Sequence, residues 1–158
     1  MLVLEAEGKR RGLSANALMT SLIARFDNWD RFADHFDFFS LTDVLFRKFI
    51  DEVEDDRIIA IARQSGATVA RDGMLFWSKE LTLESLVEYL DNRCRYAGYG
   101  SLQYEKKDRK HTLILQHKLG RKWSIFMQHT LDELFKNPLG ISAQFDTTET
   151  SVVARFTT

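Results

Sequence analysis

The chain has 158 residues, of which 44% are hydrophobic and 12% aromatic, and a formal net charge of −1 at pH 7. This length suits one domain, or one small domain with an appendage, and it is enough to bury a core. The near-neutral charge gives no overall preference for nucleic acid or for a membrane surface. A single cysteine, Cys94, excludes an intrachain disulfide, and the chain has neither a long apolar run nor a signal-peptide pattern. We therefore expect a cytoplasmic protein without a membrane partner.

The start of the chain predicts two helices joined by a tight turn. Gly12 can end the first helix in a left-handed conformation, and Ser14 can cap the second by accepting from its first free amides. Leu18, Leu22 and Phe26 then recur at four-residue steps, which indicates a broad apolar face on the second helix. One short partner helix cannot cover this face, so we expect a homodimer through the first two helices.

The stretch EAEGKRRGLSANALMTSLIARF, residues 5–26, resembles the two helices of ribbon-helix-helix DNA-binding domains of the Arc, MetJ and CopG type. In that family a strand ahead of the first helix pairs with its twin from a second chain and enters the major groove. Here residues 1–2 already read as helical, so the chain as written lacks the base-reading strand. A plain capped helical hairpin is the alternative interpretation. An in-frame alternating strand encoded upstream of Met1 would favour the DNA-binding interpretation.

The resemblance also implies how such a unit would hold DNA. The amides at the start of the second helix would bind a phosphate, and the cations at the end of the first helix would add non-specific attraction. The residues in these two roles are Lys9, Arg10, Arg11, Ser14, Ala15 and Asn16.

A run of aromatic side chains follows. The residues Phe26, Trp29, Phe32, Ala33 and Phe36 keep a helical period, so the second helix should continue to about Phe36. Such a density of rings suits either packing within the protein or stacking on bases. The interleaved aspartates would repel phosphates and therefore favour packing; they are Asp27, Asp30, Asp34 and Asp37.

The middle of the chain predicts further helices. The apolar stripe of a third helix consists of Leu41, Val44, Leu45, Phe49 and Val53. The acidic cluster in residues 51–56 invites a metal hypothesis, but carboxylates also favour the positive end of the next helix, which Gly66 should end. Residues 67–79 fit either a strand that turns at Asp-Gly or a helix, and we favour the helix because no strand partner is near. Residues 81–97 predict a helix that Thr82 can cap.

The last third predicts two hairpins that flank a helix. Residues 102–105 and 112–117 alternate as strands around a polar turn, and residues 141–145 and 151–156 form the second pair. The helix over residues 122–137 should cover one face of the resulting sheet, with Trp123, Phe126 and Leu134 buried against Leu113, Leu115, Phe145 and Val153. This ββαββ order predicts an α+β unit, and in outline it looks like the small sensor domains of ligand-binding regulators.

No sequence motif for nucleophilic catalysis, phosphate-loop binding or metal ligation occurs, so we expect neither an enzyme nor a cofactor or metal. His111 and His117 share a strand face about 20 Å apart, too far for one ion. Seven cations and two carboxylates between residues 105 and 123 give a net charge of +5. They form either a solvated face or an anion or nucleic-acid patch, split between a hairpin turn and a helix start. The candidate residues of that patch are Lys106, Lys107, Arg109, Lys110, Arg121 and Lys122.

These patterns together predict a homodimeric DNA-binding transcriptional regulator. Residues 1–37 would form the dimerisation and DNA-binding-like segment. Residues 38–158 would form a helical and α+β domain that senses a small ligand or contacts a protein. The alternative is a protein-interaction or ligand-binding module that does not bind DNA.

Overall fold

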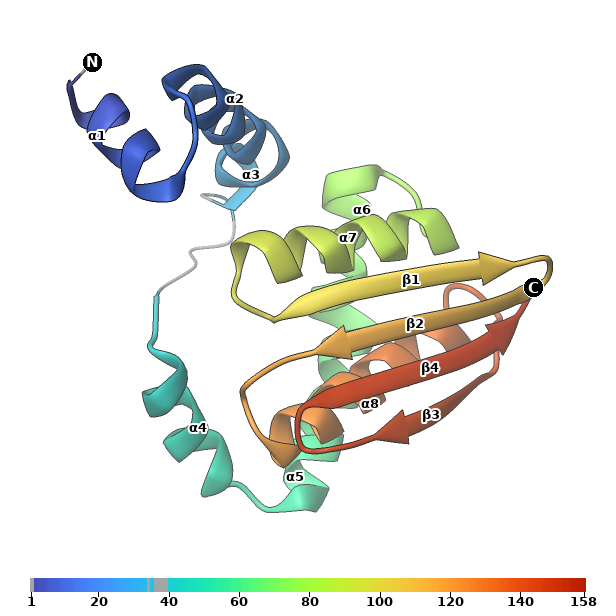
Figure 1. The fold of residues 1–158 in the computed structure, drawn as a ribbon. Coiled ribbons are helices and arrows are strands. Elements are labelled where there is room, and N and C mark those ends of the chain that lie inside the picture. The colour runs from blue at the N-terminus through green and yellow to red at the C-terminus, as the bar shows by residue number, and fades with distance from the viewer. Residues whose placement is uncertain (1, 34, 36–39) are drawn as a thin grey trace. The chain divides into compact units, whose positions relative to one another are not determined.

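A computed structural model describes residues 2–33, 35 and 40–158 (Figure 1). The chain divides into two compact units, Met1–Phe39 and Ser40–Thr158. Helices occupy the first unit, and helices with an antiparallel sheet form the second. The predicted α+β class is therefore confirmed.

The first unit contains α1 (Leu2–Arg11) and α2 (Ala15–Arg25), and helical backbone continues through η1 (Phe26–Asp30) and α3 (Arg31–Ala33). Gly12 ends α1 with a φ of 68°. The amides of Gly12 and Leu13 donate to the carbonyls of Lys9 and Gly8, which satisfies the last turn of the helix. The predicted end of the second helix near Phe36 lies outside the described residues.

The sheet of the second unit has the order β1-β2-β4-β3, with all neighbours antiparallel. The strands are β1 (Ser101–Lys107), β2 (Lys110–Gln116), β3 (Ala143–Thr147) and β4 (Ser151–Thr157), and α8 (Arg121–Lys136) lies between the two hairpins in the chain. Figure 1 shows α8 across one face of this sheet. The aromatic rings confirm this contact, because the ring centroids of Phe135 in α8 and Phe156 in β4 are 4.8 Å apart.

Most of the predicted core contacts are present. Trp123, Leu134, Leu113 and Leu115 are buried in one cluster, and Phe126 and Phe145 pack against it while partly exposed. The prediction for Val153 is wrong, because the buried residues of β4 are its neighbours Val152 and Ala154 together with Phe156. Side chains alternate along a strand, so Val153 lies on the opposite face of the sheet.

The other helices of this unit are α4 (Asp43–Asp51), α5 (Asp55–Ser65), η3 (Gly66–Ala70), α6 (Arg71–Ser78) and α7 (Leu83–Tyr96). Residues 67–78 are helical, as favoured, and Thr82 caps α7 in a capping box with Ser85. Gly66 follows the last residue of α5, as predicted, but it does not stop the helical backbone, which continues through η3 and α6. Gly66 instead lets α8 approach closely: a Cβ there would lie 2.7 Å from Cβ of Glu133 and 2.8 Å from the carbonyl oxygen of Thr130.

The apolar stripe predicted for the third helix is exposed over α4, although Val53, which follows α4, packs against the core. Val44 and Phe49, from the predicted stripe, are exposed, whereas Phe46 and Ile50 face the core. The reason is the start of α8. The Phe46 ring packs edge-on against Trp123 at 5.2 Å, and the Lys122 ammonium donates to the carbonyls of Asp51 and Val53 at 2.8 and 2.5 Å. These contacts fix which side of α4 is covered.

The close contact between Gly66 and α8 predicts how a substitution at this position changes stability. Gly66→Ala should lower the free energy of unfolding by about 1–3 kcal/mol, because the added methyl overlaps the α8 backbone. This loss should outweigh the better helix propensity of alanine, which is worth about 1 kcal/mol. Ala60→Ser on the exposed side of α5 is the control and should change stability by less than about 0.5 kcal/mol. Urea unfolding measures both, and a stabilised Gly66→Ala variant would contradict the packing described.

Candidate functional site

The start of α2 presents unpaired backbone donors. The Ser14 hydroxyl accepts from the Ala17 amide at 3.1 Å, and the Ser14 carbonyl accepts from the Leu18 amide at 3.0 Å. The amides of Ala15 and Asn16 come before the first intrahelical donor and have no acceptor within the helix. Because the helix dipole adds positive potential here, these two amides suit an anion.

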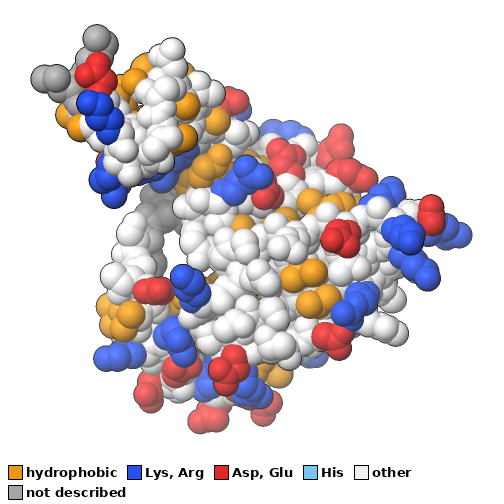
Figure 2. All heavy atoms as spheres, viewed as in Figure 1, with side chains coloured by type: hydrophobic (Ala, Val, Ile, Leu, Met, Phe, Trp, Pro, Cys, Tyr) orange, Lys and Arg blue, Asp and Glu red, His pale blue; other side chains and the backbone are white. Residues whose placement is uncertain are grey.

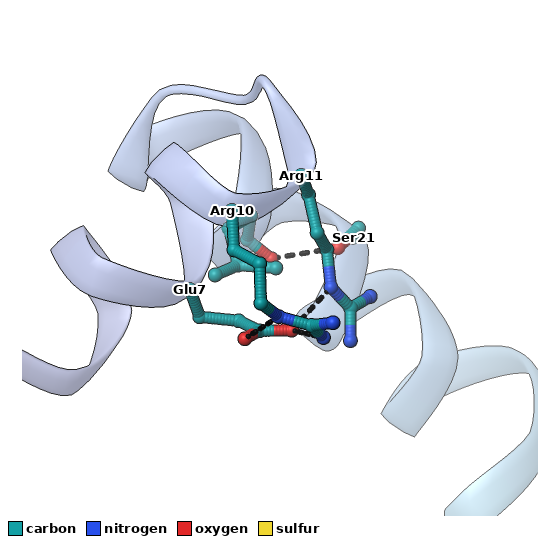
Figure 3. A network of polar contacts seen from close by, with 5 residues as sticks. Glu7, Arg10, Arg11 and Ser21 are labelled. Atoms are coloured by element: carbon teal, nitrogen blue, oxygen red, sulfur yellow. Dashed lines mark hydrogen bonds and ion pairs between the residues drawn. The ribbon is translucent and has the colours of Figure 1, made fainter.

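The cations at the end of α1 are partly neutralised by Glu7. Arg10 donates to the Glu7 carboxylate at 2.8 and 2.6 Å, and Arg11 donates to it at 2.5 Å. Figure 3 shows the Glu7 carboxylate reaching both guanidinium groups. The hydrogen bonds from Arg10, and then the one from Arg11, lower the pKa of Glu7 to about 2. Lys9 is exposed and forms no ion pair with any described residue, so the end of α1 carries a net charge of +2, from three cations and Glu7.

The outer side of α2 exposes a continuous apolar surface. Its side chains are Met19, Leu22, Ile23 and Phe26, with exposed fractions of 47%, 48%, 64% and 60%. We call these four residues the α2 stripe. Their spacing places them on one face of the helix. Leu18, which the sequence pattern grouped with them, is only 2% exposed and packs inside the unit. A contiguous exposed apolar patch of this kind typically marks an interaction surface.

The second set of predicted cations does not form one surface. Lys106, Lys107, Arg109 and Lys110 lie at the β1–β2 turn, whereas Arg121 and Lys122 begin α8 at the other end of β2. Figure 2 shows Lys and Arg side chains gathered over that turn. Arg121 pairs with Asp55 at 2.9 Å. The Lys122 ammonium donates to the carbonyls of Asp51 and Val53 at the end of α4, and Arg109 donates to the Thr158 carbonyl at 2.7 Å. Of the six predicted cations, the three lysines at the turn are exposed and make none of these contacts.

His111 of β2 and His117, which directly follows this strand, are buried and hydrogen-bonded. His111 stacks on Phe156 at 5.0 Å, with Nδ1 bonded to the Tyr104 hydroxyl at 2.6 Å and Nε2 to the Thr158 hydroxyl at 2.9 Å. His117 accepts at Nδ1 from the Leu119 amide, so its Nε2–H donates to the Ser124 hydroxyl at 2.8 Å. This pattern requires a neutral His117 ring. Burial lowers the pKa of both rings, and Lys106 lowers that of His111 further.

The sequence patterns missed one buried cation, Arg93 of α7. Arg93 is 4% exposed, and its guanidinium carbon lies 4.9 Å from the Tyr89 ring and 5.7 Å from the rings of Trp77 and Tyr99. Three aromatic faces therefore surround one positive charge, a favourable arrangement when it is desolvated. A basic residue in the last turn of a helix looks like an ordinary partner of the helix dipole, so no sequence pattern indicates this role.

The described residues also bear on metal binding and on membrane insertion. Residues 2–33, 35 and 40–158 contain no group of three or more His, Cys, Asp or Glu that could hold a metal ion. None of their helices has the length and apolarity needed to cross a bilayer. Comparison of the chain with protein families and with curated proteins found no match.

The buried histidines predict a pH dependence of stability. Their pKa values are lowered in the folded state, so the unfolded chain binds more protons as the pH falls through 6.5. The histidine contribution to the free energy of unfolding is therefore full above pH 6.5 and is lost progressively at lower pH. Urea unfolding between pH 7.5 and about 5.5 measures this slope. The slope should flatten in a His117→Gln variant, whereas equal slopes in the two proteins would contradict the assigned hydrogen bonding.

Proposed function

We propose that the protein is a homodimeric DNA-binding transcriptional regulator of the cytoplasm, whose C-terminal unit is a sensor or interaction module. The observation that carries this proposal is that the N-terminal unit combines an apolar surface with groups that suit an anion. One small helical unit has an exposed apolar stripe for a second chain, and it also has free amides and cations for a phosphate.

Dimerisation follows from the size of that unit. Among its described residues the buried hydrophobic side chains are Leu18 and Trp29, which make a small core. Chains below about 40 residues usually need oligomerisation or another constraint to fold. A second copy supplies an identical stripe, and two such stripes related by a two-fold axis cover each other.

Phosphate contact follows from charge and backbone. The amides of Ala15 and Asn16 would bind the phosphate oxygens, while Lys9 would add attraction through its free ammonium. Arg10 and Arg11 would exchange Glu7 for a phosphate, because exposed ion pairs are weak. Contacts of this kind position a protein on DNA but do not read bases. Through these phosphate contacts alone, binding should show little sequence preference.

The second candidate is an interaction or ligand-binding module that does not bind DNA. The pairing of Arg10 and Arg11 with one carboxylate favours it, because that contact lowers the net positive charge available to a phosphate. The two candidates differ in DNA affinity and share the expectation of a dimer.

Replacement of Leu22 by Asp tests the dimer. Leu22 is half exposed within one chain, so the charge should leave the fold of each chain intact but should be buried in the interface of a dimer. Sedimentation should report a dimer for the unmodified protein and a monomer for Leu22→Asp. Val3→Asp, at an 80% exposed position of α1, is the control and should remain dimeric. A Leu22→Asp variant that stays dimeric with an intact fold would contradict the proposal.

A salt titration tests DNA binding. The logarithm of the affinity for a mixed-sequence duplex should fall linearly with the logarithm of salt concentration. Joint replacement of Lys9, Arg10 and Arg11 by Ala should reduce the size of that slope by about 2–3, since each phosphate contact contributes about 0.9. Replacement of Lys106, Lys107 and Lys110 by Ala is the matched control and should leave the slope unchanged. A slope that responds only to the control set would place DNA on the C-terminal unit and contradict the proposal.

A further inference from the structure

A groove lies between α7 and the edge strand β1. Its volume is about 470 Å³ and it is open to solvent. Val87 of α7 and Leu102 and Tyr104 of β1 make its lining largely apolar, and Glu84 and Glu88 stand on the α7 wall. Figure 1 shows α7 running beside β1. An open channel along a strand suits an extended chain better than an enclosed small molecule.

The strand that borders this groove has a free edge. β1 pairs with β2 on one side and is the last strand of the sheet on the other. β1 and β2 pair in an antiparallel ladder that ends at Lys107 and Lys110, on either side of a two-residue turn. In such a ladder, every second residue of β1 points its N–H and C=O away from β2. Within the described chain, no backbone hydrogen bond outside the sheet ladder involves residues 101–107. The strand therefore presents unpaired main-chain donors and acceptors beside the groove.

The side chains on this strand face the groove at alternate positions. Leu102, Tyr104 and Lys106 pair across the ladder with Leu115, Leu113 and His111, which are all buried on the helix side. The apolar surface of Leu102 and Tyr104 is thus next to the free backbone groups of the same strand. An added strand would find main-chain partners and apolar contacts together.

The charges on the α7 wall indicate what the added strand should carry. Glu84 and Glu88 are exposed, lie four residues apart and form no ion pair with any described residue. The next carboxylate along the helix, Asp91, is already paired with Arg95 at 2.6 Å. These two carboxylates outnumber Lys106, the one cation that β1 adds to the lining, so the groove complements a peptide that combines apolar side chains with a lysine or arginine.

We propose that the groove between α7 and β1 binds an extended peptide of a partner protein by strand addition to β1. Apolar side chains at alternate positions of the peptide contact Val87, Leu102 and Tyr104. A basic side chain of the peptide pairs with Glu84 or Glu88. This proposal names the partner chemistry of the interaction module in the proposed function. It concerns the C-terminal unit alone and stands whether or not the N-terminal unit binds DNA.

The competing account is that the charges only protect the edge. An inward-facing charge such as Lys106 on an edge strand is a common device against unwanted pairing. On that account no peptide should bind at β1, so a binding experiment separates the two.

The experiment uses the full chain and a displayed library of random nine-residue peptides. Selection should enrich peptides with apolar residues at alternating positions and at least one lysine or arginine. The synthetic consensus peptide should bind at least tenfold more weakly to a Glu84→Lys, Glu88→Lys variant. Glu149→Lys, at an exposed position in the β3–β4 turn, is the control and should bind as the unmodified protein does. If the Glu84→Lys, Glu88→Lys variant does not fold, a Glu84→Gln, Glu88→Gln variant replaces it. This variant should also bind the peptide more weakly than the unmodified protein does.

Backbone methylation of the peptide tests strand addition itself. Two peptides of the consensus sequence carry N-methyl groups on alternate amides, in the two complementary sets. One set should abolish binding and the other should not, because only every second amide faces β1. Failure to enrich any peptide, equal binding to both methylated peptides, or unchanged binding by the Glu84 and Glu88 variants would overturn the proposal. DNA affinity is measured separately on the same protein, so either function can fail alone.

Discussion

The C-terminal unit depends on α8 being covered on two sides at once. Toward the sheet, the Phe135 ring meets Phe145 and Phe156. Toward α5, the Thr130 hydroxyl donates to the Ala62 carbonyl at 3.2 Å, and the missing side chain of Gly66 allows close contact between the helices. A helix buried on both sides couples the sheet layer to the helix layer. The positions of α4, α5 and the sheet therefore follow from one element.

The N-terminal unit has the opposite character. Its two helices are joined by a well-formed turn, but the apolar side chains of the α2 stripe remain outside. Local signals such as the Gly12 turn and the Ser14 cap define the helices without supplying a core. In the proposed dimer, the stripe of a second chain would cover these side chains and so supply the apolar contacts that the unit lacks by itself. The ionic contacts of Glu7 add little to the stability of the unit, because they are exposed.

Local patterns predicted the elements better than their packing. The alternation in β2, the cap at Thr82 and the helix after Leu119 follow from residue types within a few positions, and all three are present. The apolar stripe predicted for the third helix did not identify the buried side of α4, because apolar residues cover most of the surface of this helix. The side that packs is selected by Trp123 and Lys122, which lie more than 70 residues away in the chain. The role of Gly66 was not predictable for a related reason. A glycine that permits close packing of two helices looks the same in sequence as one that ends a helix.

The candidate site was predictable in composition but not in pairing. Glu7 lies three and four residues before Arg10 and Arg11, a spacing that indicates ion pairs on a helix, and it changes the charge expected for that end of α1. The separation of Arg121 and Lys122 from the β1–β2 turn required the sheet register. The groove beside β1 required knowledge that β1 is an edge strand, which no local pattern in the chain contains.

The most direct test of the central claim is to map where DNA contacts the full chain. Amide resonances of the isotopically labelled protein are followed while a short duplex of mixed sequence is added at low salt. The account predicts that the largest shifts fall on Lys9 and on the start of α2, at Ala15 and Asn16. Shifts confined to residues 105–122, or no shifts at any duplex concentration, would contradict it.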